Sequence, residues 1–238
     1  MHSWLRQIKA ISFDGDMTLW DFQKVMRQSL GYALAELRRC APSEASAKLT
    51  VDRMIEIRDT VAAELQGKVT DLEEIRLHAF KRTLEHIGVE NDELAAHLSA
   101  LYLQYRHANI ELYPDTLPAL DALKPYFQLG LISNGNTHPE RHGMQDYFAF
   151  VLFSQDFRAG KPDPAIFHAA CCKAGCTPGE LLHVGDSLKT DVEGANRAGA
   201  VSVWLNRRQE SINGSIIPDF TVETLTELAH TLRKTVSS

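Results

Sequence analysis

A short apolar segment near the start of the chain ends abruptly at two aspartates. Residues 8–13 are short enough to form a buried strand, and Asp14, Gly15 and Asp16 follow directly. Two carboxylates at the edge of a core are costly unless they are paired or bind a cation. At the carboxyl end of a strand in an open α/β sheet, they would face the crevice where ligands bind. The pattern therefore points to a cation or catalytic site at a sheet edge, with a turn of solvated aspartates as the alternative.

A long helical block follows this strand. A stripe of apolar residues with helical spacing covers residues 22–40, and further helices are predicted over 43–67, from Asp71 to Gly88, and from Asn91 to Tyr105. A crossover between two parallel strands normally needs a single helix. We therefore expect an inserted all-helical domain over residues 21–109.

The rest of the chain alternates between strands and helices. Apolar strand segments are predicted at 127–132, 148–153, 181–184 and 201–204, with a short edge strand at 218–222. Helices are predicted between them at 115–125, at 165–174 and up to Gly199, with a closing helix at 224–234. This alternation predicts a parallel sheet that is covered on both faces. The fold class is therefore α/β, a Rossmann-like doubly wound parallel sheet formed by residues 1–20 and 110–238.

Polar residues stand at the ends of three predicted strands, and a lysine lies in a proline-rich loop between two of them. These residues are Asp14 and Asp16, Ser133 and Asn134, Asp186, and Lys161, with Asp191 about one turn into the following helix. Each has an ordinary explanation as a turn, a solvated loop or a helix cap. In a doubly wound sheet, however, all these strand ends lie on one edge. Their joint occurrence predicts a single site.

Composition excludes two classes of partner. The 238 residues carry a net charge of −6, which disfavours a nucleic-acid partner. No apolar segment approaches the roughly 20 residues that a membrane span requires. The first residues also lack the apolar core of a signal peptide. We therefore expect a cytoplasmic protein.

The polar strand ends resemble the four motifs of the haloacid dehalogenase (HAD) superfamily. The matching segments are Asp14-Gly15-Asp16-Met17-Thr18, Ser133, Lys161-Pro162, and Gly185-Asp186-Ser187 with Asp191. The resemblance extends from residue 8 to about residue 204, and the helical block falls where that family carries a helical cap. Gly15 departs from the pattern, since the family often has a bulkier apolar residue there. We expect little consequence from this difference.

The resemblance implies a role for each matching residue. Asp14 would be the nucleophile that forms an aspartyl-phosphate, and Asp16 would act first as general acid and then as general base. Thr18, Ser133 and the amides near Asn134 would hold phosphate oxygens, and Lys161 would offset negative charge. Mg²⁺ would be bound by the carboxylates of Asp14 and Asp186 and by the main-chain carbonyl of Asp16, with Asp191 supporting the site from nearby.

These roles predict a Mg²⁺-dependent phosphatase of a small phosphorylated metabolite, such as a sugar phosphate or phosphoglycolate. The alternatives are a haloacid dehalogenase and a non-catalytic HAD-like interaction protein. Asp16 argues against dehalogenation, because halide departs as an anion without a proton and the family's dehalogenases typically lack an aspartate there. The intact motif residues argue against a non-catalytic relic. The protein is expected to be a monomer or a homodimer.

Two further groups of residues have both an ordinary and a functional interpretation. Arg58, Lys68 and Arg76 in the helical block are candidates to contact an anionic part of the substrate, although most charges on helices are simply solvated. His138 and His142 have the spacing of a helical metal site, but Pro139 and the loop context favour an ordinary polar loop.

Overall fold

The chain folds into two compact units. The computed structural model describes residues 7–157, 159–212 and 214–236. One unit, here called the α/β unit, contains the described residues up to Asp21 and those from Glu111 onward. The other, the helical unit, is Phe22–Ile110. Compared with the predicted division, Asp21 lies with the α/β unit and Ile110 with the helical unit.

A parallel sheet forms the centre of the α/β unit. Within the described residues it has six strands in the order β3-β2-β1-β4-β5-β6, and every neighbouring pair is parallel. The strands are β1 (Ala10–Phe13), β2 (Gln128–Ser133), β3 (Phe150–Phe153), β4 (Leu181–Gly185), β5 (Val201–Leu205) and β6 (Phe220–Val222). The chain builds outward from β1 to β3 and then returns to place β4 on the other side of β1. The doubly wound prediction is confirmed, and the ends of β1 and β4 meet at the topological switch point.

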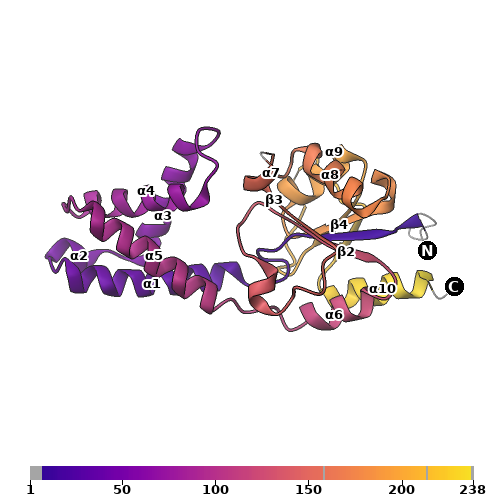
Figure 1. The fold of residues 1–238 in the computed structure, drawn as a ribbon, viewed down its shortest axis with the longest axis horizontal. Helices are drawn as coiled ribbons and strands as arrows, with labels where there is room; N and C mark the ends of the chain where they lie inside the picture. The colour runs from indigo at the N-terminus through magenta and orange to yellow at the C-terminus, as the bar shows by residue number, and fades with distance from the viewer. Residues whose placement is uncertain (1–6, 158, 213, 237–238) are drawn as a thin grey trace. The chain divides into compact units, whose positions relative to one another are not determined.

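Helices cover both faces of this sheet (Figure 1). The helices α8 (Pro164–Ala174) and α9 (Glu193–Ala198) lie on one face, and α6 (Thr116–Leu123) and α10 (Leu225–Val236) lie on the other. All residues of β1 and β4 are buried as a result. This double cover explains why the strands read as nearly continuous apolar runs, with Ser12 and His183 as polar exceptions.

The segment before α9 differs from the predicted single helix. Leu188–Val192 forms a π-helical turn, in which Ser187 O accepts hydrogen bonds from both Asp191 N (3.0 Å) and Val192 N (3.2 Å). Such widened turns are rare and are frequent at functional sites. Here the turn brings the Asp191 carboxylate back over the Ser187 N–H, at 3.0 Å.

The helical unit packs its helices around an apolar core of its own. Its elements are α1 (Phe22–Cys40), α2 (Glu44–Lys48), α3 (Val51–Leu65), α4 (Leu72–His86) and α5 (Asp92–Ala108), with α1 against α5 and α3 against α4. The predicted helix over 43–67 is broken, because Leu49 is extended and Thr50 caps α3 by accepting a hydrogen bond from Arg53 N. Asp71 and Asn91 cap α4 and α5 as predicted. Throughout the described residues, every helix is too short or too polar to cross a bilayer.

Candidate active site

The loop that follows β1 is tightly folded. Asp14 is buried, and its N–H donates to Val184 O (2.8 Å) on the neighbouring strand β4. Met17 has a φ of +65°, in the left-handed region that side chains rarely adopt, and its N–H donates to Trp20 O (2.8 Å). Leu19 N donates to Gly15 O (2.8 Å). These bonds close the loop on itself and fix the directions of its side chains.

A tryptophan that sequence reasoning missed contacts the second aspartate of this loop. Trp20 is fully buried, and its Nε1–H donates to Asp16 Oδ1 at 2.6 Å. An ideal Cβ on Gly15 would lie 2.4 Å from the indole carbon Cζ2 of Trp20. A glycine at this position leaves room for the indole, which any other side chain would displace. Whether this departure from the family pattern affects activity stays a prediction.

Lys161 joins two of the predicted carboxylates. Its Nζ lies 2.6 Å from Asp14 Oδ1 and 2.6 Å from Asp191 Oδ1, and its side chain is almost fully buried. The Asn134 side chain fixes the main chain of the lysine loop, donating to Lys161 O (2.8 Å) and accepting from Lys161 N (2.9 Å). The amide group of the Asn134 side chain therefore positions the lysine, and the main-chain N–H of Asn134 is the candidate for phosphate binding.

Asp191 is held on its far side by a buried histidine. Its Oδ1 also accepts from His183 Nε2 (3.1 Å), and Ser12 Oγ lies 2.8 Å from His183 Nδ1. Because a carboxylate can only accept, the His183 proton sits on Nε2 and Ser12 donates to Nδ1. With Ser187 N bound to Oδ2, both oxygens of Asp191 are engaged. A histidine inside an otherwise apolar strand was the sequence signal for this contact.

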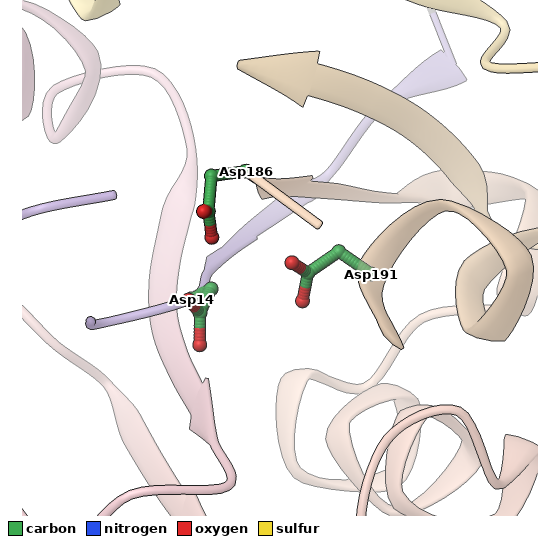
Figure 2. Close-up of side chains that lie close together, drawn as sticks. All are labelled: Asp14, Asp186 and Asp191. Carbon is green, nitrogen blue, oxygen red and sulfur yellow. The ribbon is translucent and has the colours of Figure 1, made fainter. Parts of the chain in front are cut away.

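Three carboxylates form a cluster with metal-ligand geometry. Asp14, Asp186 and Asp191 each place an oxygen within 4.8 Å of the others, and Figure 2 shows their side chains side by side. Since both oxygens of Asp191 have other partners, Asp14 and Asp186 are the ligand candidates. Within the part of the chain that the structure describes, His138 and His142 belong to no such cluster.

The protonation equilibria of this cluster show a deficit of positive charge. Burial, reinforced by neighbouring carboxylates, raises the pKa of Asp14 well above its usual value and that of Asp186 to about 6. Burial opposes the charged forms of Lys161 and Asp191, yet their mutual attraction outweighs it: the pKa of Lys161 is raised and that of Asp191 lowered. A single buried lysine does not balance these acids. A hard divalent cation bound by oxygen ligands fits the remaining charge.

Two more of the predicted residues, Thr18 and Ser133, carry hydroxyl groups near the ends of β1 and β2. The Thr18 side chain is fully buried, and its Oγ1 has no hydrogen-bond partner among the described residues. Ser133, at the end of β2, accepts a hydrogen bond from Gly135 N (3.0 Å). An ideal Cβ on Gly135 would lie 2.6 Å from Asp16 Oδ2 and 3.3 Å from Ser133 Oγ. The structure thus brings the ends of β1 and β2 together around Asp16.

Two side chains from the segment after β4 fix the main chain of the site. Trp204 on β5 donates from Nε1 to Asp186 O (2.8 Å), and Arg207 donates from Nη2 to Thr18 O (3.0 Å). Arg207 is itself held by Asp115, with contacts of 2.9 and 3.0 Å. No local sequence pattern marks either residue, because both contacts join different elements of the fold.

The three basic candidates of the helical unit differ in their surroundings. Arg58 pairs with Asp59 at 2.6 Å, and Lys68 donates to Glu64 O at 2.9 Å. Arg76 instead has a buried Nη1 with no hydrogen-bond partner among the described residues. The ordinary interpretation of a solvated helix charge therefore suits Arg58 and Lys68 but does not describe Arg76.

Comparisons with known proteins agree on one family. Residues 8–199 match the family model described as haloacid dehalogenase-like hydrolase. The chain is 30% identical over 238 residues to glyceraldehyde 3-phosphate phosphatase of Methanopyrus kandleri, which covers 95% of this chain and 98% of the relative. It is also 30% identical over 203 residues to 5-amino-6-(5-phospho-D-ribitylamino)uracil phosphatase YigB of Escherichia coli, covering 84% of each.

Solved structures show the same fold. A 2-haloacid dehalogenase from Pseudomonas syringae pv. Tomato superposes with a TM-score of 0.77 at 31% identity, over 95% of this chain and 99% of the other. HAD phosphatase from Thermococcus onnurineus superposes with a TM-score of 0.63 at 27% identity, over 94% and 98%. The family match covers most of the chain and includes the strand-end residues described above. This protein belongs to the haloacid dehalogenase-like hydrolase family.

Proposed function

We propose that this protein is a Mg²⁺-dependent phosphatase that hydrolyses a small phosphorylated metabolite through an aspartyl-phosphate on Asp14. The observation that carries the proposal is the buried contact of Asp14 with Lys161, at 2.6 Å, beside a second carboxyl group on Asp16. An anionic nucleophile approaches an anionic phosphoryl group only where positive charge is already in place. The relatives named as phosphatases support the same reaction class.

The first half-reaction transfers the phosphoryl group to the protein. A carboxylate oxygen of Asp14 attacks phosphorus, and the bond between phosphorus and the ester oxygen breaks. Asp16 gives its proton to that oxygen, so the product leaves as an alcohol. Lys161 neutralises charge on Asp14 and on the phosphoryl group, while Thr18 Oγ1, Ser133 and the main-chain N–H of Asn134 bind phosphate oxygens.

The second half-reaction restores the protein. Asp16, now a carboxylate, removes a proton from water, and the hydroxide oxygen attacks phosphorus. The bond between phosphorus and Asp14 breaks, which releases inorganic phosphate and returns both aspartates to their starting protonation states. The same carboxyl group therefore serves as acid and then as base.

The residues present fit a magnesium ion. Asp14 and Asp186 would hold it with their carboxylates and Asp16 with its main-chain carbonyl; burial raises the pKa of both carboxyl groups, and a bound cation would favour their charged forms. When bound, Mg²⁺ supplies charge neutralisation at the phosphoryl group. Asp191 supports the site indirectly through Lys161 and the Ser187 N–H.

The substrate is proposed only as a class. The phosphatase relatives are named for different small phosphate esters, among them glyceraldehyde 3-phosphate and N-acylneuraminate 9-phosphate. Sugar phosphates and phosphoglycolate remain the first compounds to test. The helical unit is proposed to act as a cap that excludes water and selects the substrate.

A haloacid dehalogenase is the second candidate, because one similar solved structure is named as such. Dehalogenation releases an anion that needs no proton. The Asp16 carboxyl group, held by the indole of Trp20 beside Ser133 and Gly135, would have no task in that reaction. This argument favours phosphoryl transfer.

Hydrolysis of p-nitrophenyl phosphate, with Mg²⁺ and with EDTA, tests the proposal together with chloride release from 2-chloropropionate. We expect Mg²⁺-dependent phosphate release that is lost in Asp14→Asn and retained in Asp156→Asn, whose carboxylate is exposed on α7 (Ser154–Phe157). A panel of metabolite phosphates follows if the generic ester is not cleaved. Chloride release without phosphatase activity, or phosphate release that survives Asp14→Asn, would contradict the proposal.

A further inference from the structure

Trp20 is a fully buried side chain beside the reacting groups that the proposed mechanism does not use. Its Nε1 lies 2.6 Å from Asp16 Oδ1, which is short for a nitrogen–oxygen hydrogen bond. An indole N–H can only donate, so this contact is made to a lone pair of the carboxyl oxygen. Hydrogen bonds to a carboxylate are among the stronger ones in proteins.

The position of the indole is fixed from several directions. The Trp20 main chain accepts a hydrogen bond from Met17 N (2.8 Å) and pairs with Leu112 in an antiparallel bridge. The ring lies directly over Gly15, where even one methyl group would be 2.4 Å from Cζ2. The tryptophan therefore occupies a space that the glycine leaves open, and a side chain at position 15 would displace the indole.

This contact makes the two oxygens of Asp16 unequal. Oδ1 is bound by Trp20, whereas Oδ2 lies against Gly135 and Ser133 at the end of β2. The proposed site for phosphate oxygens includes Ser133. Of the two oxygens, Oδ2 is therefore the one directed toward the place where the leaving oxygen is released.

We propose that Trp20 is a positioning residue for proton transfer: its indole N–H holds Oδ1 of Asp16 so that Oδ2 exchanges the proton with the leaving oxygen. This inference rests on the proposed phosphatase function. Without the N–H, the Asp16 carboxyl group loses its contact at Oδ1, and a smaller fraction of molecules has Oδ2 in the productive direction. The loss then falls on the step in which the leaving group needs a proton.

Leaving-group dependence tests this inference. Phenyl phosphate and p-nitrophenyl phosphate have similar shapes, but phenoxide is far more basic and depends much more on protonation as it leaves. General acid catalysis contributes roughly 10²–10⁴-fold, so we expect Trp20→Phe to lower kcat/KM about tenfold more for phenyl phosphate than for p-nitrophenyl phosphate. The quantity kcat/KM includes only steps up to phosphoryl transfer, so the shared hydrolysis of the aspartyl-phosphate does not mask the effect.

Two comparisons separate positioning from packing. Trp204→Phe removes the other indole N–H of the site, which binds Asp186 O, and any loss should be equal for both esters. In an Asp16→Ala background, Trp20→Phe should add no further difference between the esters. The ratio of the two kcat/KM values from one preparation does not depend on the folded fraction, so partial unfolding of a variant does not disturb the result.

The outcomes distinguish this inference from the proposed function. Equal losses for both esters in Trp20→Phe, no loss for either, or a selective loss that persists with Asp16→Ala would overturn the positioning role and leave the phosphatase intact. A wild-type protein that hydrolyses no phosphate monoester, or an Asp14→Asn variant that still does, would overturn the proposed function itself.

Discussion

Two ion pairs in this molecule have the same length but very different surroundings. Lys161 and Asp14 in the α/β unit lie 2.6 Å apart with side chains 2% and 11% exposed. Arg27 and Asp52 in the helical unit also lie 2.6 Å apart, with side chains 45% and 72% exposed. Exposed pairs gain little because water screens them, whereas a buried charge left without its partner is strongly destabilising. Burial, and not distance, separates the two.

The difference extends to the rest of each unit. Around Lys161 the charged groups share partners, since the lysine bridges two carboxylates and His183 holds one of them. In the helical unit, ion pairs such as those of Lys48 with Glu44 and Arg82 with Glu64 join exposed side chains. The buried charges around Lys161 can act on a bound substrate with little screening by water, whereas water screens the exposed pairs of the helical unit.

Removal of the shared cation should have the largest effect. Lys161→Met leaves Asp14 and Asp191 facing each other without a positive charge. We expect kcat/KM for p-nitrophenyl phosphate to fall by about 10²–10³-fold and the free energy of unfolding by about 3–5 kcal/mol. Steady-state kinetics and urea denaturation measure the two quantities. Lys173→Met, at an exposed position on α8, is the matched control and should change neither. Retained activity in Lys161→Met would show that the buried network is not the catalytic one.

Magnesium affinity should depend on pH because of the raised pKa of Asp186, about 6. The folded-state pKa lies above the usual value of a carboxyl group, so the metal-free protein loses stability as pH rises through the interval between the two. Mg²⁺ needs the carboxylate, so its apparent affinity should fall by about tenfold per pH unit below this pKa. Titration calorimetry at pH 5, 6 and 7 measures it. Equal affinity at pH 5 and pH 7 would contradict the assignment of Asp186 as a ligand.

The sequence predicted those parts of the site whose signal is local. Asp14 and Asp186 each follow an apolar strand directly, and the alternation of strands and helices is enough to bring their ends together. The proline-rich loop around Lys161 was the sequence signal that predicted this residue as part of the site. Its contacts with Asp14 and Asp191 then follow from the fold.

The parts that could not be predicted depend on packing between distant segments. Arg207 reaches the Thr18 carbonyl from the segment after β5, and Trp204 reaches that of Asp186 from β5 itself. The pairing of Gly15 with Trp20 is close in sequence, but it depends on the left-handed turn between them. No composition or period signals that turn, because Met17 occupies it instead of glycine.

Arg76 tests the contrast between buried charges in the α/β unit and exposed charges in the helical unit, because it is a helical-unit residue with a buried nitrogen. Its guanidinium lies over the Tyr102 ring at 5.3 Å, and burial, with the charge of Arg106 nearby, lowers its pKa to about 10. A buried N–H without a partner costs about 1–3 kcal/mol, partly offset by the ring contact at about 0.5–1 kcal/mol. Arg76→Met should therefore raise the free energy of unfolding by about 1 kcal/mol, measured by urea denaturation. Arg53→Met, at an exposed position, is the control. Destabilisation by Arg76→Met would show that the guanidinium is satisfied in solution.

The pair of Arg27 and Asp52 should give the smallest effect, although its 2.6 Å contact is as short as that of Lys161. Arg27→Ala alone is ambiguous, because alanine favours a helix and offsets any lost attraction. A double-mutant cycle with Asp52→Ala removes this contribution, and we expect a coupling energy of about 0.2–1 kcal/mol that decreases in 1 M salt. Urea denaturation of the four proteins measures it, and activity should not change. A coupling energy comparable to the loss in Lys161→Met would mean that length alone determines the strength of an ion pair here. The contrast between the two units would then fail.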